Sequence, residues 1–90
     1  KIQILILEVK VNKKKIKLST PEMVADFINV CSKYECDINL YDGRNILDAK
    51  SIIGVFGVMQ GKVIEVQAIS SDESVISSFI EDMRRFEVEV

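Results

Sequence analysis

The sequence predicts an α+β fold, a two-layer sandwich in which helices cover the one apolar face of a sheet. Two stretches, at about residues 23–31 and 75–83, repeat apolar residues at helical spacing. Other stretches alternate apolar and polar residues as half-buried strands do. The resulting order is β-α-β-β-α-β-α, with β-like additions at both ends. Because the chain has 90 residues, we expect a single domain over 1–90.

The composition argues against several classes of function. Twelve basic and fourteen acidic residues give a net charge of −2, whereas nucleic-acid binding needs an excess of positive charge. The chain has no histidine and only two cysteines, Cys31 and Cys36, which are too few ligands for a zinc site. We interpret both as buried thiols of a cytoplasmic protein. The longest apolar run, at residues 4–7, is too short for a membrane span. We expect no cofactor, no metal and no catalytic residue.

The N-terminal region is rich in β-forming residues. Apolar residues alternate from Ile2 to Val11 and change parity on the way, which indicates a bulge or burial on both faces. The lysine run at 13–15 is interpreted as a solvated turn or a charged strand edge. Alternation resumes at Ile16 and Leu18, so this region forms either one long strand or a hairpin. Residues 1–13 are therefore expected to add a β-like segment to the domain.

The first helix has a clear start. A serine and a threonine, Ser19 and Thr20, precede Pro21, which suits the first turn of a helix. Glu22 stands three residues after Ser19, as in a capping box. The helical spacing of apolar residues then predicts a helix to about Tyr34.

A hairpin is expected next. Residues 36–41 alternate as a strand with one buried face, and residues 44–48 return as its partner. Between them, Asp42 and Gly43 are typical of a type I′ turn, in which both central residues have positive φ.

Further helix starts, a turn and strands are expected in the second half of the chain. Ser51 is expected to open a short helix through Met59, and Gly61 marks a turn before a strand at 62–68. Residues 70–73 cap a last helix whose C-terminal end carries Arg84 and Arg85. Residues 86–90 alternate again and are expected to form an extra strand, which could pair with the N-terminal one.

One group of short motifs resembles a known family. Ser32-Lys33-Tyr34 is followed by Asp37-Ile38-Asn39-Leu40, a Gly-centred turn and Asp48-Ala49-Lys50-Ser51-Ile52-Ile53-Gly54. These segments resemble the HPr family, the small phosphocarriers of the bacterial sugar phosphotransferase system, and the likeness covers most of residues 20–83. The resemblance implies an open two-layer sandwich with a four-stranded antiparallel sheet and three helices on one face. It also implies that the protein is not an enzyme.

The resemblance implies two phosphorylation positions. The family's active-site histidine aligns with Thr20, next to Ser19, and its arginine aligns with Glu22. A phosphate ester on a hydroxyl is too stable to serve as a relay, and Glu22 would repel phosphate. We therefore expect that phosphocarrier activity is lost, as in the catabolite-repression HPr-like proteins.

The second position is the family's regulatory serine, which aligns with Ser51. The resemblance implies that an HPr-kinase-like enzyme phosphorylates it, and that the product binds a transcriptional regulator or a metabolic enzyme. A phosphate there would meet a helix N-terminus and the adjacent Lys50. The structural alternative is that Ser51 only caps a helix.

An apolar helix flanks Ser51. Because its apolar residues cover almost the whole circumference, we favour a partner surface over ordinary core or a dimer contact. With Lys50, the candidate surface consists of Ile52, Ile53, Val55, Phe56, Val58 and Met59.

The sequence is also compatible with two further hypotheses. A small-molecule-sensing domain of the ferredoxin-like or ACT type shares the β-α-β-β-α-β order. The β-rich termini also suggest a homodimer through paired or exchanged N-terminal strands.

Overall fold

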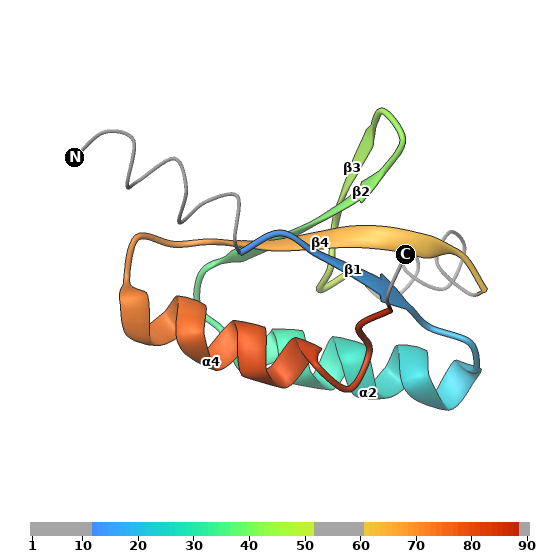
Figure 1. Cartoon of the computed structure of the whole chain (residues 1–90), viewed down its shortest axis with the longest axis horizontal. Helices are drawn as coiled ribbons and strands as arrows, with labels where there is room; N and C mark the ends of the chain where they lie inside the picture. The colour runs from blue at the N-terminus through green and yellow to red at the C-terminus, as the bar shows by residue number, and fades with distance from the viewer. Residues whose placement is uncertain (1–11, 52–60, 89–90) are drawn as a thin grey trace.

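The computed structural model describes residues 12–51 and 61–88, which form a sheet with two helices on one face (Figure 1). The strands are β1 (Lys14–Lys17), β2 (Asp37–Asp42), β3 (Asn45–Asp48) and β4 (Val63–Ile69). The helices are α2 (Pro21–Ser32) and α4 (Glu73–Met83). The α+β class and the four-stranded antiparallel sheet are thus confirmed. The third expected helix, at 51–59, and the expected segment at 1–13 fall almost entirely outside the described residues.

Strand β4 lies at the centre of the sheet, whose order is β1-β4-β2-β3. It pairs antiparallel with β1, where Ile16 faces Ile64, and with β2, where Leu40 faces Val66. These four residues are buried because the alternation of each strand directs them to the same face. The alternation seen in the sequence therefore predicted the inner face correctly.

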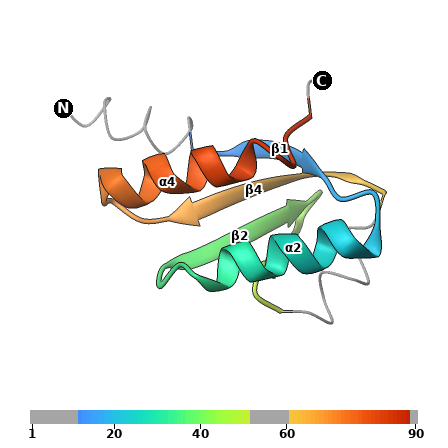
Figure 2. The ribbon, with the colours of Figure 1, turned by 90° about the horizontal axis from the view of Figure 1, so that it is seen from below.

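The two helices run antiparallel and side by side across that inner face, as Figure 2 shows from below. Helix α2 buries Val24, Phe27, Ile28, Val30 and Cys31, while α4 buries only Phe79 and Met83. The ring of Phe27 packs edge-on against Phe86 at a centroid distance of 5.5 Å. The core is thus one layer of side chains between the helices and the sheet.

The hairpin turn differs from the expected one. Asp42 pairs with Asn45 as the last residue of β2, so the central residues are Gly43 and Arg44. Gly43 has φ +59°, and no other residue type has positive φ in the part of the chain that is described. The prediction of an Asp42-Gly43 type I′ turn is therefore wrong. A single positive φ at the first central position, filled by glycine, is typical of a type II′ turn.

The C-terminal tail lies along the outer edge of β1. The Lys17 amide donates to the Phe86 carbonyl at 3.0 Å, and the Val88 amide donates to the Lys15 carbonyl at 3.0 Å. Glu87 forms a bridge with Ile16 and an ion pair with Lys14 at 3.5 Å. Lys14 and Lys15 are thus part of a charged strand edge, so for these two residues the expectation of a strand edge is correct and that of a solvated turn is not.

Gly43→Ala is expected to lower the free energy of unfolding by about 1 kcal/mol, because a side chain disfavours positive φ. The cost is conformational, since a Cβ at Gly43 would meet no atom within 4 Å. Arg44→Ala, at the other central position, should change it by less than about 0.5 kcal/mol. Urea denaturation of the two variants measures both values, and equal stabilities would contradict the assigned turn.

Candidate functional site

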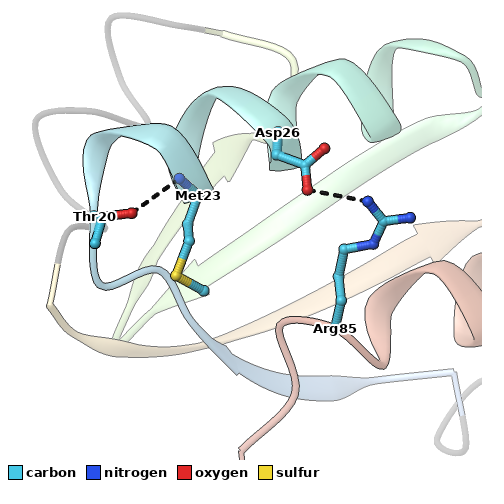
Figure 3. A network of polar contacts seen from close by, with 4 residues as sticks. All are labelled: Thr20, Met23, Asp26 and Arg85. Carbon is cyan, nitrogen blue, oxygen red and sulfur yellow. Dashed lines mark hydrogen bonds and ion pairs between the residues drawn. The ribbon is translucent and has the colours of Figure 1, made fainter.

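The start of α2 is capped by Thr20. Its backbone is extended, and its Oγ1 accepts a hydrogen bond from the Met23 amide at 3.2 Å (Figure 3). Met23 therefore occupies the position three residues after the cap, where a capping box needs glutamate or glutamine. The capping box expected between Ser19 and Glu22 is not used. Ser19, Thr20 and Glu22 are all exposed at this helix end.

Neighbouring segments fix the loop before α2. Leu18 is fully buried, and its carbonyl accepts a hydrogen bond from the Gly61 amide at 2.8 Å. Arg85 reaches Asp26 on α2 with Nη1 at 3.0 Å from the carboxylate (Figure 3). The Arg85 guanidinium thus already has a carboxylate partner, and Glu22 adds negative charge in the first turn of α2.

Ser51 stands at the end of a tight turn that follows β3. Its amide donates to the Asp48 carbonyl at 3.0 Å, and the Lys50 amide donates to Asp48 Oδ1 at 2.9 Å. Between them Ala49 is fully buried, and its amide donates to the Ile38 carbonyl at 2.9 Å. These bonds fix the backbone on which the exposed Ser51 stands.

Lys50 makes contacts that the sequence did not reveal. Its ammonium donates to the carbonyls of Tyr34, at 2.5 Å, and Cys36, at 2.9 Å. Both carbonyls belong to the connection between α2 and β2. Their pairing with Lys50 joins segments that are distant in sequence, so no local pattern indicates it. The expectation that Lys50 is simply a positive neighbour of Ser51 omits these contacts.

Tyr34 continues these contacts to the second helix. Its hydroxyl donates to Asp82 at 2.5 Å and lies 3.0 Å from the Ser78 hydroxyl, both on α4. Its ring packs edge-on against Phe79. Burial and the Asp82 hydrogen bond raise the pKa of Tyr34 to about 12. At neutral pH the hydroxyl is therefore protonated and acts as a donor.

The cysteines provide no reactive site. Burial raises the pKa of the Cys31 thiol to about 12, so almost no thiolate is present at neutral pH. Both cysteines are free thiols, but the prediction that both are buried is confirmed only for Cys31, since Cys36 is half-buried at the edge of the core. No group of three or more potential metal ligands gathers among residues 12–51 and 61–88. Over the same residues, no helix is long and apolar enough to cross a membrane.

The candidate positions do not form one site. Thr20 stands at the start of α2, and the Lys50 ammonium reaches the residues beyond its end, about 18 Å away along a helix of 12 residues. The rest of the proposed partner surface lies outside the described residues: Ile52, Ile53, Val55, Phe56, Val58 and Met59.

Comparisons with known proteins agree on the fold. The family model described as the PTS HPr component phosphorylation site matches residues 22–85, a range that includes Ser51 and begins just after Thr20. HPr-C-His from Thermoanaerobacter tengcongensis is similar at 28% identity and a TM-score of 0.61, over 81% of this chain and 88% of that one. A search of curated proteins found no match.

Two further solved structures share the fold. The phosphocarrier protein HPr of Bacillus anthracis matches at 19% identity and a TM-score of 0.58, over 78% of this chain and 93% of that one. The histidine-containing phosphocarrier protein of Mycoplasma matches at 18% identity and a TM-score of 0.60, over 79% of this chain and 90% of that one.

Thr20→Ala is expected to lower the free energy of unfolding by about 1 kcal/mol, because the Met23 amide loses its acceptor. Ser19→Ala is the matched control and should change it by less than about 0.5 kcal/mol. Chemical denaturation measures both values. A larger loss for Ser19→Ala would show that the serine caps the helix instead.

Proposed function

The chain belongs to the HPr family of the phosphotransferase system, and from this we propose that it is a regulatory, protein-binding member that does not carry phosphate on histidine. Its 90 residues contain no histidine. Phosphohistidine is a high-energy species that passes its phosphoryl group onward, whereas a phosphate ester on Ser19 or Thr20 would not. This single chemical difference carries the proposal.

The electrostatics at the start of α2 support the same proposal. A phosphocarrier site benefits from a cation beside the phosphate. Here Glu22 is exposed in the first turn of α2, and Arg85 is paired with Asp26. A phosphoryl group at Thr20 would therefore gain little from its charged neighbours.

Ser51 is the position at which we propose that the protein is switched. It is exposed, and its backbone is fixed by Asp48. Accessibility is what a protein kinase needs, and a fixed backbone gives its partner a defined phosphate position. An HPr-kinase-like enzyme would transfer the γ-phosphoryl group of ATP to Ser51 Oγ, releasing ADP and the hydroxyl proton.

The proposed partner of the phosphorylated protein is a transcriptional regulator or a metabolic enzyme in the cytoplasm. It would contact Lys50 and the apolar residues after Ser51, where an exposed apolar group would suit protein binding. The family match favours this function over that of a small-molecule-sensing domain.

Incubation with an HPr kinase and ATP is expected to place one phosphate on Ser51, detected by intact mass and peptide mapping. Ser51→Ala should remain unmodified. Incubation with Enzyme I and phosphoenolpyruvate should add none, while an authentic histidine-bearing HPr is labelled in parallel. If a kinase that is active on authentic HPr leaves Ser51 unmodified, the proposed switch fails.

We also propose a homodimer through the N-terminal strands. β1 bonds to β4 on one side and to residues 86–88 on the other. Such pairing would therefore involve residues 1–11, which lie outside the described residues.

Multi-angle light scattering is expected to give twice the monomer mass at micromolar concentration. Removal of residues 1–11 should restore the monomer mass while the circular dichroism spectrum keeps its helical and strand content. A monomer mass for the intact chain over the whole micromolar range would contradict the dimer.

A further inference from the structure

Lys50 connects the turn that carries Ser51 to the connection between α2 and β2. Its half-buried ammonium donates to the carbonyls of Tyr34 and Cys36. No ion pair of Lys50 is found among the described residues, in contrast to Lys14 and Lys62, which reach Glu87 and Asp42. Within this part of the chain, the hydrogen-bond partners of the Lys50 ammonium are these two neutral carbonyls.

The two carbonyls lie just beyond the end of a helix. Helix α2 ends at Ser32, and the Lys33 and Tyr34 amides close its last turn on Val30 and Cys31. Neither carbonyl belongs to a helix or a strand, so each needs a donor from outside the regular hydrogen-bond ladders. The ammonium supplies such a donor, so the geometry of residues 34–36 depends on where the Lys50 side chain points.

The contact extends to the second helix. The Tyr34 carbonyl accepts a hydrogen bond from Lys50. The Tyr34 hydroxyl donates to Asp82 and is hydrogen-bonded to Ser78, both on α4. A displacement of the Tyr34 backbone would therefore also alter the contacts of its hydroxyl with α4. These bonds form a continuous series of contacts from the Ser51 turn to α4.

We propose that Lys50 transmits the phosphorylation state of Ser51 to the α2–β2 connection. This inference rests on the proposed function, in which Ser51 is phosphorylated. A phosphoserine has a charge of about −1.5 to −2 at neutral pH and is a stronger acceptor for an ammonium than a neutral carbonyl. The phosphate on the next residue is within reach of the flexible four-carbon side chain. The ammonium moves to the phosphate, and the carbonyls of Tyr34 and Cys36 lose their donor.

The proposal assigns two consequences to one modification. The phosphate adds negative charge at Ser51, and the α2–β2 connection is released from its lysine. A partner that requires the modified protein can thus distinguish the two forms at residues 34–36 as well as at the phosphate itself.

The test places phosphoserine at position 51 by genetic encoding or peptide ligation, so that it does not depend on any kinase. Carbonyl carbon chemical shifts of Tyr34 and Cys36, measured by NMR, report the two hydrogen bonds. Both are expected to move upfield relative to the unmodified protein, in the direction produced by Lys50→Met. In the Lys50→Met background, phosphoserine at 51 should cause no further shift at either carbonyl.

Two controls match these changes. Phosphoserine at position 19 adds the same charge at the other end of α2, and Lys62→Met removes an exposed ammonium whose partner is Asp42. Neither should move the two carbonyl shifts. Lys50→Leu, which also lacks a donor, replaces Lys50→Met if the latter does not fold.

The inference is overturned if phosphoserine at 51 leaves both carbonyl shifts unchanged, or shifts them equally with and without Lys50. It is also overturned if removal of Lys50 has no effect on them. Failure of a kinase to modify Ser51 would instead count against the proposed function, because the encoded phosphoserine tests Lys50 separately.

Discussion

Burial of the inner face of the sheet beneath α2 and α4 is the interaction on which the rest of the structure depends. Buried apolar side chains from β1, β2 and β4 lie under the two helices, and β4 joins β1 to β2 inside the sheet. This core also places both candidate positions. Thr20 stands two residues after the fully buried Leu18, and Ser51 two residues after the fully buried Ala49. In each case a buried residue anchors the backbone while the hydroxyl-bearing residue stays exposed.

The sequence predicted the strands and helices whose apolar residues recur at a regular spacing. Alternation in Ile38 and Leu40 or in Ile64 and Val66 follows from one-sided burial, and helical spacing follows from a helix lying on a sheet. The exact residue at which a helix or a turn begins was less predictable where adjacent residues suit that position equally well. Ser19 and Thr20 are both good caps, and only the actual path of the chain into α2 selects Thr20. Likewise Asp42 continues the ladder of β2, which moves the turn by one residue.

Contacts between distant segments were not predictable at all. The bond from Lys50 to Tyr34 brings together a turn and the end of a helix, and neither segment has a composition that indicates the other. Gln67 is a similar case, because its strand pattern places it on the open face of the sheet. It is nonetheless almost fully buried and accepts a hydrogen bond from the Tyr41 hydroxyl at 2.8 Å. Polar side chains reach such positions when specific partners satisfy them, and tertiary structure supplies those partners.

The two edge strands of the sheet, β3 and β1, differ in the chain entropy that is lost when they pair with their neighbours. β2 and β3 are joined by a turn of two residues, so almost no loop has to be closed when they pair. Among residues 12–51 and 61–88, the strand partners of β1 lie far along the chain, since Lys14 pairs with Val66 and Ile16 with Glu87. Long loops must lose their freedom before β1 forms these pairs, so its place in the sheet depends on cooperation with the helices that bury Ile16.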